Sequence, residues 1–392
     1  MKAHKKARKR EGGAMIVFLL AIFLLYSLIH LYIFLKIKAA LTFGTMATIF
    51  LVFFMAIMVI APVVVRIFER YGCDFSARLI SYIGYTWMGL AFLFFSISFP
   101  LDLYRSFIYA GGFMFQMDIS YLIPSTRFAF FVTVLGTAVI ASYGYFEARS
   151  VRNETVLIKS PKIPQEVGTL TIAQISDVHL GLIVREGRLK RILREVERAK
   201  PDMVVSTGDL VDGEMGNLLG LADTLRAINP KYGKFAATGN HEFYAGLDQA
   251  LHFMGKAGFT VLRGEALSIA GIITIAGVDD PTGKHFGLSI GVEEGDLLSG
   301  LPRERFTLLL KHIPVVDANA PGLFDLQLSG HTHKGQIFPF SLITRLFFPT
   351  DAGLAHLPNN CDLYVSRGSG TWGPPIRFLS PPEVTVIKLV HG

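Results

Sequence analysis

The sequence contains few cysteines and few charged residues for its length. Of its 392 residues only Cys73 and Cys361 are cysteines, and their wide separation fits neither a zinc-ligand motif nor a disulfide-stapled scaffold. Charged residues make up 18% of the chain, compared with roughly 25% in an ordinary soluble domain. Because hydrophobic residues reach 51%, the composition excludes a disordered or collagen-like chain.

The excess positive charge is confined to the first 150 residues. There, 14 Lys and Arg stand against 6 acidic residues, a net charge of +8, whereas residues 151–392 hold 24 against 25, a net charge of −1. Nine of the eleven histidines lie in the second part, and its near-neutral charge argues against nucleic-acid binding. We therefore predict a transmembrane anchor domain at 1–150, a polar linker at 151–168 and a second domain at 169–392.

Four stretches of the anchor are long and apolar enough to span a membrane, which takes about 20 residues. They are residues 14–35, 39–65, 79–99 and 128–146. The first is too long for the core of a signal peptide, so we expect it to be retained. Basic residues at 2–10, 66–78 and 149–152 place the amino terminus and the second domain in the cytoplasm, because such residues flank spans on that side. We thus expect a multi-pass protein of the cytoplasmic membrane.

Residues 101–125 mix apolar residues with Asp102, Arg105 and Asp118. We interpret them as an interfacial segment on the outer face, with both aspartates in water. If they spanned instead, there would be five spans and the second domain would face outward. His30 is expected to hydrogen-bond within the bundle. Charge pairs do not recur at helical spacing along the spans, so an anchor is favoured over a transporter.

The second domain alternates short apolar runs with amphipathic stretches, which predicts an α/β fold. Strands are expected at 170–175, 203–206, 235–237, 272–276, 307–310, 326–328, 363–365 and 384–389. A helix is expected at 188–199, where arginines alternate with glutamates and indicate a solvated face. Polar residues follow the strands, where α/β folds place their chemistry.

Potential metal ligands follow five of these strands in order. They are Asp177, His179, Asp209, Asp212, Asn240, His241, His312, His331 and His333. Carboxylate and amide oxygens with imidazole nitrogens suit manganese, iron or zinc better than calcium. The i, i+2 spacing lets two side chains of one extended segment reach the same centre, and adjacent glycines permit tight turns. Any one motif is a common loop pattern, but the five together predict a metal site.

The series D-x-H, G-D-x-x-D, G-N-H-E, a single His and G-H-T-H resembles the calcineurin-like metallophosphoesterase family over roughly residues 170–390. Residues 366–373 and 380–384 resemble its membrane-associated bacterial branch. The resemblance implies a four-layer αββα sandwich after the transmembrane bundle. It also implies two divalent metal ions, with manganese favoured and iron or zinc as alternatives.

The resemblance also implies a role for each motif residue. Asp177, His179 and His333 would bind the first ion, Asn240, His312 and His331 the second, and Asp209 both. His241, oriented by Asp212, would stand beside the phosphate. Together these roles imply hydrolysis by a metal-bridging hydroxide, with His241 assisting departure of the leaving group.

The stretch after His333 is apolar and contains Arg345, Phe347 and Phe348. It is either a lip that enters the membrane or receives an acyl chain, with Arg345 at a headgroup phosphate, or a hairpin covering the sandwich core. We predict an integral-membrane phosphoesterase that cleaves a phosphodiester or pyrophosphate of a lipid or lipid-linked substrate. Hydrolysis of the UDP-2,3-diacylglucosamine type is one candidate reaction, by analogy only. The alternative is a membrane sensor or scaffold that binds a phosphorylated ligand without turnover.

Overall fold

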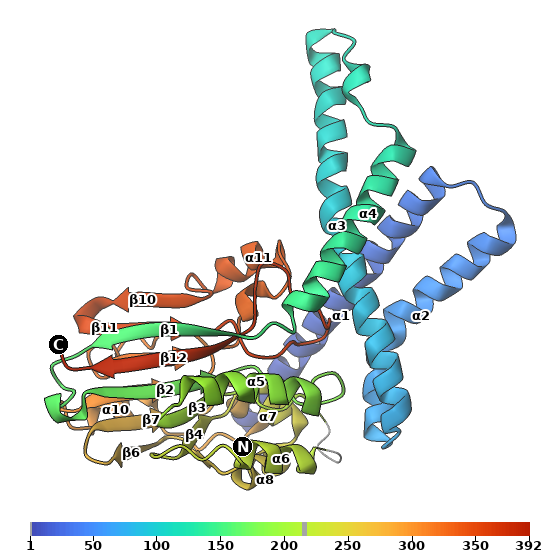
Figure 1. Ribbon diagram of the computed structural model, residues 1–392. Coiled ribbons are helices and arrows are strands. Elements are labelled where there is room, and N and C mark those ends of the chain that lie inside the picture. Colours follow the sequence, from blue (N-terminus) through green and yellow to red (C-terminus); the bar gives the residue numbers. More distant parts are fainter. Residues whose placement is uncertain (1, 214–217) are drawn as a thin grey trace. The chain divides into compact units, whose positions relative to one another are not determined.

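The computed structural model describes residues 2–213 and 218–392, which form two compact units, Met1–Tyr145 and Phe146–Gly392. The first unit is helical (Figure 1). Its elements are α1 (Lys2–Ala40), α2 (Thr45–Arg70), α3 (Asp74–Phe115), the short η1 (Ser120–Leu122) and α4 (Thr126–Glu147), whose last residues reach the second unit. By length and composition, four helical segments of the described chain can cross a membrane, which is the number expected.

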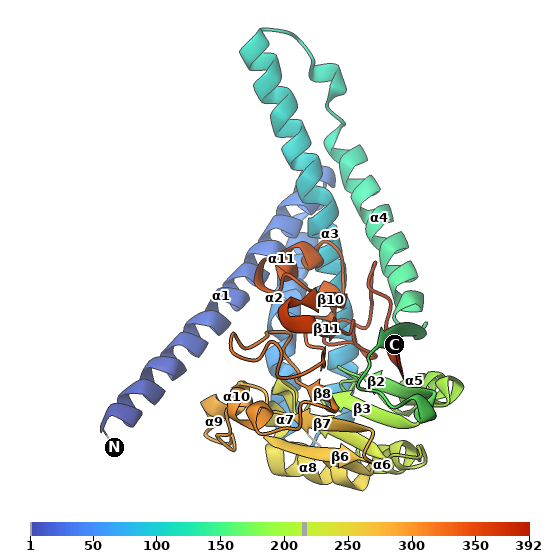
Figure 2. The same ribbon diagram turned by 90° about the vertical axis from the view of Figure 1, so that its left-hand side faces the viewer.

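Helix α3 is 42 residues long, or about 63 Å at 1.5 Å per residue, roughly twice the hydrocarbon thickness of a bilayer. Residues 101–115 continue this helix beyond Pro100, so the expectation of a separate interfacial segment is wrong for them. A single proline removes one N–H from a long apolar helix, and such a loss is tolerated in membrane helices. Figure 2 shows the turn that joins α3 to α4.

Several polar contacts join α1 to α3. Asp102 forms an ion pair with Lys36 and accepts a hydrogen bond of 2.5 Å from the Tyr32 hydroxyl. The expectation that Asp102 lies in water is therefore wrong, because the helix containing it carries the carboxylate to α1. His30 is buried and lies 2.8 Å from the indole nitrogen of Trp87, as expected for a histidine that hydrogen-bonds within the bundle.

The second unit contains two six-stranded mixed sheets. The first has the order β1-β12-β2-β3-β4-β5 and the second β10-β11-β9-β8-β7-β6. The strands are β1 (Arg152–Lys159), β2 (Thr169–Ile175), β3 (Met203–Thr207), β4 (Lys234–Ala237), β5 (Phe259–Val261), β6 (Glu265–Ile269), β7 (Ile273–Gly277), β8 (Phe306–Leu310), β9 (Leu326–Ser329), β10 (Gly353–Leu357), β11 (Cys361–Val365) and β12 (Glu383–Val390). The helices are α5 (Glu186–Ala199), α6 (Leu219–Arg226), α7 (Asn240–Ala245), α8 (Leu247–Lys256), α9 (Thr282–Phe286), α10 (Glu294–Ser299) and α11 (Phe340–Phe347), with short turns η2 (Gln165–Val167), η3 (His333–Gly335) and η4 (Pro358–Asn360).

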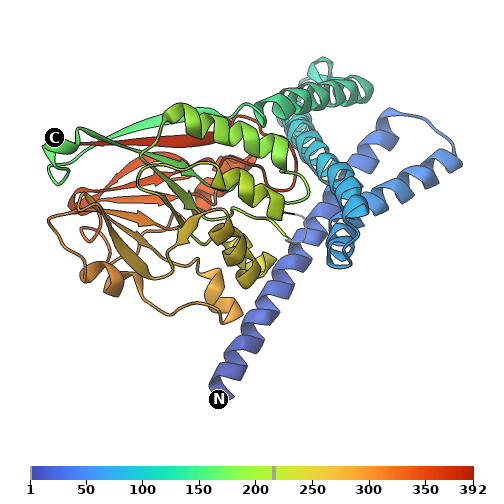
Figure 3. The ribbon, with the colours of Figure 1, turned by 60° about the horizontal axis from the view of Figure 1, so that its bottom comes forward.

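The side chains of a strand pack alternately into two apolar layers, because successive side chains point to opposite faces of a sheet. In β2, Ile172 packs in the core between the two sheets, while Ala173 packs against the helices outside the first sheet. Helix α5 contributes Ile192 and Val196 to that outer layer. On the other side, α10 packs on the second sheet. The result is the expected αββα sandwich, and Figure 3 shows the outer helices beside the sheets.

Every strand expected from the sequence is present within one or two residues. The strands not expected are β1, β5, β6 and β10, all of which lie at sheet edges. The prediction of a linker at 151–168 is wrong for residues 152–159, which form β1 and pair in parallel with β12 along the whole strand. These polar residues resembled a linker because β1 is an edge strand with one partner and an exposed face.

Candidate metal centre and active site

The predicted ligands converge because their strands are neighbours. β2, β3 and β4 run parallel and adjacent in the first sheet, and β8 and β9 do so in the second. The carboxyl ends of parallel strands meet at one sheet edge, so the loops after them share one region. All seven predicted metal ligands and His241 lie in these loops or, for Asn240 and His241, in the first turn of α7.

Five of the seven predicted ligands have left-handed backbone conformations. Their φ angles are 51° for Asp177, 53° for His179, 52° for Asp209, 72° for His331 and 49° for His333. Such conformations cost about 1–3 kcal/mol each for residues other than glycine. They persist here because hydrogen bonds from neighbouring loops hold them, which indicates that the positions of these side chains matter more than local stability.

Two glycines beside the ligands leave space that a side chain would fill. A Cβ atom on Gly330 would lie 2.0 Å from the Ser176 Oγ and 2.2 Å from the Asp177 Oδ2. A Cβ atom on Gly239 would lie 2.2 Å from the Asp209 Oδ1. The sequence suggested that glycines beside the ligands permit tight turns. At Gly239 and Gly330 the reason is instead close packing, because two loops from different strands approach each other with no room for a side chain.

One group of ligand atoms comes from Asp177, His179 and His333, which lie close enough to hold one ion. The Nε2 atoms of the two histidines are 3.1 Å apart, and the Asp177 Oδ1 lies 3.5 Å from the His333 Nε2. Asp177 also accepts hydrogen bonds from the Ser176 hydroxyl at 2.5 Å and from the His331 backbone at 2.9 Å. These contacts orient the carboxylate toward the histidines.

A second group comes from Asp209, His312 and His331, with Asn240 beside them. The Asn240 Oδ1 lies 3.1 Å from both the His312 Nε2 and the His331 Nδ1. The Asp209 Oδ2 is 3.2 Å from the His312 Nε2 and 3.8 Å from the His179 Nε2 of the first group. Asp209 therefore stands between the two groups, where a shared ligand would be needed.

This second group fits a cation by its chemistry. The His312 Nδ1 lies 2.8 Å from the Thr207 carbonyl, which can only accept, so the proton is on Nδ1 and the Nε2 lone pair faces the site. That lone pair meets the Asp209 and Asn240 oxygens, which are also acceptors. Buried acceptors that face one another are unfavourable unless a proton or a metal ion lies between them.

The charges in the site shift its pKa values in opposite directions. Burial lowers the pKa of His312, but the Asp209 charge and hydrogen bond outweigh it and hold this pKa well above the ordinary value of 6.5. Burial, His179 and Arg377 lower the pKa of His333 well below 6.5. The first shift shows the protein holding a proton in the place that a cation would take.

His241 lies beside the first group without belonging to it. Its Nδ1 is 2.9 Å from the Asp212 Oδ1, and its backbone N–H donates to the Asp209 Oδ1 at 2.8 Å. Burial lowers the pKa of His241, but Asp209 and Asp212 raise it to about 9. Burial raises the pKa of Asp212, but the neighbouring imidazoles of His179 and His241 outweigh it and hold this pKa well under 3.8. Asp212 thus favours the protonated form of the His241 ring beside the candidate metal centre.

Glu242 was given no role from the sequence, yet it joins two loops of the site. Its buried carboxylate accepts backbone hydrogen bonds from Asp209 at 2.9 Å, Leu210 at 2.8 Å and Gly239 at 2.6 Å. The G-N-H-E motif contains both Glu242 and Gly239, but it does not show the partners Asp209 and Leu210, which belong to the loop after β3.

Arg377 was also missed. It is completely buried, lies 3.1 Å from the His333 Nδ1 and donates to the backbone carbonyls of Gly370 and Arg367. It therefore fixes the loop at 366–380 beside the first group of ligands. In the sequence, residues 366–373 resembled the membrane-associated bacterial branch of the family, but no role was predicted for Arg377.

An aromatic group, which we call the aromatic shelf, flanks His241. Tyr244 lies 5.4 Å and Trp372 lies 6.0 Å from the His241 ring, and Phe286 lies 6.0 Å from Tyr244. All three rings are exposed by 42–56%. Aromatic rings beside a histidine are not detectable from sequence spacing, because they come from α7, α9 and the loop before β12.

The apolar stretch after His333 forms helix α11, which exposes Leu346 by 81% and Phe347 by 73%. The Phe348 ring lies 5.5 Å from the ring of His331, so the helix ends beside the second group of ligands. Arg345 forms an ion pair of 3.1 Å with Asp351. Of the three residues predicted to contact substrate, Phe348 alone lies against a candidate ligand.

The sandwich and its clustered Asp, Asn and His side chains define a metal-dependent phosphoesterase. A family model of the calcineurin-like phosphoesterases matches residues 170–335. A metallophosphoesterase of Aquifex aeolicus is 44% identical over 261 residues, which cover 66% of this chain and 98% of its own. The chain therefore belongs to the calcineurin-like metallophosphoesterase family, whose members are metal-dependent phosphoric ester hydrolases that use two divalent ions.

Relatives occur in other organisms, and the name of one of them combines a transmembrane part with a metallophosphoesterase domain. A transmembrane protein with metallophosphoesterase domain from Danio rerio is 34% identical over 64% of this chain and 61% of its own length. The metallophosphoesterase YkuE of Bacillus subtilis is 33% identical over 62% of this chain and 87% of its own. Similar chains thus occur in bacteria and vertebrates, and the apolar helices here agree with membrane association.

Proposed function

We propose that this chain is an integral-membrane phosphoesterase that cleaves a phosphodiester or pyrophosphate bond of a lipid or lipid-linked substrate. The observation that carries the proposal is the position of α11, an exposed apolar helix that ends against His331. A surface suited to lipid, helix α11, therefore lies beside the candidate metal centre.

The proposed ligand roles follow the two groups. Asp177, His179 and His333 hold one ion, Asn240, His312 and His331 hold the other, and Asp209 contacts both. Two such ions neutralise charge on the phosphoryl oxygens and lower the pKa of a bound water. The native metal is proposed to be manganese, with iron or zinc as the alternatives that the same donor set accepts.

His241 is proposed as the acid that protonates the leaving oxygen. Asp212 holds its Nδ1, which leaves the Nε2 proton to face the substrate, and the raised pKa keeps that proton on the ring at neutral pH. Since the His241 backbone also donates to Asp209, the acid and the shared ligand keep a fixed spacing. Transfer of this proton avoids the release of a strongly basic alkoxide.

Recognition of the substrate is proposed to use both sides of the centre. The exposed Leu346 and Phe347 of α11 suit an acyl chain, while the aromatic shelf suits a flat ring in the leaving group, by stacking. A substrate of the UDP-2,3-diacylglucosamine type has both features. Arg345, which is paired with Asp351, has further N–H groups that can reach a headgroup phosphate.

The enzyme proposal is tested with purified full-length protein, bis-p-nitrophenyl phosphate and added manganese. We expect His241→Ala to lower kcat by on the order of 10²–10⁴, while His252→Ala, an exposed histidine on α8, leaves it unchanged. If the protein is inactive with every divalent metal tried, and His241→Ala leaves ligand binding intact, the sensor or scaffold function replaces this one. The complete set of seven donors currently favours turnover.

The catalytic unit is proposed to face the cytoplasm. Four spans and the basic residues at 2–10 support this side. A reporter fused after residue 392 that is active only outside the cytoplasm tests it. Activity of that reporter would place the unit on the opposite side and contradict the proposal.

A further inference from the structure

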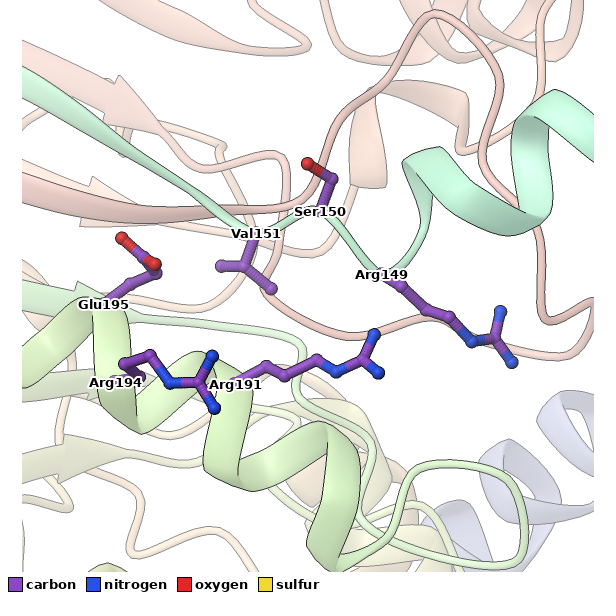
Figure 4. A pocket seen from close by; sticks show the side chains of 6 residues that line it. All are labelled: Arg149, Ser150, Val151, Arg191, Arg194 and Glu195. Carbon is purple, nitrogen blue, oxygen red and sulfur yellow. The ribbon is translucent and has the colours of Figure 1, made fainter.

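The arginine-rich face of α5 borders a cavity. Its volume is about 370 Å³, and all six residues that line it belong to the second unit. They are Arg149, Ser150, Val151, Arg191, Arg194 and Glu195. Figure 4 shows the side chain of Arg191 extending from α5 toward the chain at Arg149, whose own side chain points away from Val151. We call this the basic cavity. The sequence predicted a solvated face for this helix, which is right for the exposed Arg191 and Arg194 but wrong for Arg188, which is buried.

The basic cavity is strongly positive. Its single acidic residue, Glu195, already accepts hydrogen bonds of 2.8 Å from Arg198 at both carboxylate oxygens. Neither Arg191 nor Arg194 has an acidic partner within ion-pair distance among the residues that the structure describes. The guanidinium groups of Arg191 and Arg194 therefore line a space whose one carboxylate, that of Glu195, is already paired with Arg198.

The walls of the basic cavity are held together by hydrogen bonds. The buried Arg188, one turn before Arg191, donates to the Ala148 carbonyl and to the Thr371 hydroxyl. The Asn153 amide donates to the Glu195 carbonyl at 3.1 Å. These bonds fix α5 against residues 148–153, so the arginines are arranged before any ligand arrives, which reduces the entropy lost on binding.

Chain connectivity keeps the basic cavity near the membrane surface. Arg149 follows Glu147, the last residue of α4 and of a candidate span, by two positions, or at most about 7.6 Å of chain. The headgroup layer of a bilayer is roughly 5–8 Å thick on each side. The chain at residues 149–151, which lines one side of the basic cavity, is therefore within reach of the headgroup layer.

We propose that the basic cavity binds the phosphate of an anionic phospholipid headgroup and so holds α5 at the bilayer surface. Guanidinium groups recognise phosphate through paired charge-assisted hydrogen bonds. The site is separate from the candidate metal centre, since none of its lining residues is a proposed ligand. It requires no turnover, so it stands independently of the proposed reaction.

The test is lipid binding to the full-length protein, delipidated in a neutral detergent and titrated with dioleoylphosphatidylglycerol. Retained lipid is counted by native mass spectrometry for the wild type and for Arg191→Gln/Arg194→Gln. The matched control is Lys190→Gln/Lys256→Gln, which removes the same charge from exposed positions outside the cavity. Each single arginine variant is measured as well, in case the double variant folds poorly.

We expect the arginine variant to bind this lipid about tenfold or more weakly, with the control within about twofold of wild type. Bis-p-nitrophenyl phosphate hydrolysis should be unchanged in both, which shows that the fold is intact. Equal lipid binding by wild type and arginine variant overturns the proposal. So does binding of inorganic phosphate at the same arginines as tightly as the lipid, because the ligand would then be a soluble phosphate.

Discussion

Replacement of Glu242 by glutamine tests how the loops of the metal centre are held. One carboxylate oxygen accepts from Asp209 and Gly239, and the other accepts from Leu210 at 2.8 Å and from Val211 at 3.3 Å. Glutamine has nearly the same shape, but its NH₂ group would replace one of these oxygens. Two backbone donors would then face a third donor in a buried space.

The magnitude follows from the bonds lost. Each hydrogen bond to a charged acceptor contributes about 1.5–3 kcal/mol. Losing two of them lowers the free energy of opening the two loops by about 3 kcal/mol at the low end. Since every 1.4 kcal/mol is tenfold, the amides of residues 209–211 and 239 should exchange with deuterium about a hundredfold faster in Glu242→Gln.

The assay is hydrogen–deuterium exchange with mass spectrometry on peptides that cover these amides. Glu293→Gln is the matched control, because its carboxylate pairs with Lys284 on the surface, and it should change no exchange rate in the site. Burial and the Asp209 charge raise the pKa of Glu242, so the alternative hypothesis is that the Glu242 side chain is protonated and uncharged. If Glu242→Gln exchanges like wild type, the side chain is protonated and does not hold the loops as argued.

Three further predictions concern the metal, the glycines and the apolar helix. In chelator-treated protein, the raised pKa of His312 means that the folded state keeps a proton that the unfolded state loses above about pH 6.5. That contribution to stability is complete below pH 6.5 and is lost as pH rises through the folded pKa. Metal binding should release the proton, and calorimetry would detect the release as a binding enthalpy that depends on the buffer. Gly330→Ala should abolish binding of one manganese ion, because its Cβ would lie 2.2 Å from the Asp177 carboxylate, as counted by elemental analysis. Leu346→Ser/Phe347→Ser should lower kcat/KM about tenfold or more on a lipid phosphodiester in mixed micelles, since it removes two exposed apolar side chains.

Each of these has a control and an opposing result. A binding enthalpy that is the same in buffers of different ionisation enthalpy would show that His312 carries no proton to release. Gly187→Ala, where a Cβ meets nothing within 4 Å, should keep both metal ions, and loss of metal there would mean that helix α5 tolerates no change. Leu288→Ser is the control for α11, and hydrolysis of bis-p-nitrophenyl phosphate should be equal in all three proteins. Equal loss on both substrates would show that α11 supports the fold rather than the lipid.

The sequence predicted those parts of the site that depend on local order. Asp177, Asp209 and His331 each follow a strand whose apolar run is readable, and parallel strands bring their ends together. The resemblance then supplied the grouping into two sets of ligands. Glu242 and Arg377 could not be assigned because most of their partners are backbone atoms, which leave no pattern of side chains in the sequence.

The fold shows the same division. Buried strands such as β3 and β8 have continuous apolar runs, whereas β1 is an edge strand whose exposed face is polar. Helix α3 extends past Pro100, and nothing local distinguishes that proline from a helix end. Asp102 pairs with Lys36 on another helix. Hydropathy along a single segment cannot show such a partner, so it predicts that the charge lies in water.

The pairing of β1 with β12 constrains how the protein is made. β1 begins five residues after α4, so it leaves the ribosome together with the membrane helices, but its sole strand neighbour starts at Glu383. At 5–20 residues per second, synthesis from residue 159 to residue 383 takes roughly 10–45 s. During that interval the first sheet lacks the strand that joins β1 to β2. The nascent catalytic unit therefore has an open sheet edge until β12 is made.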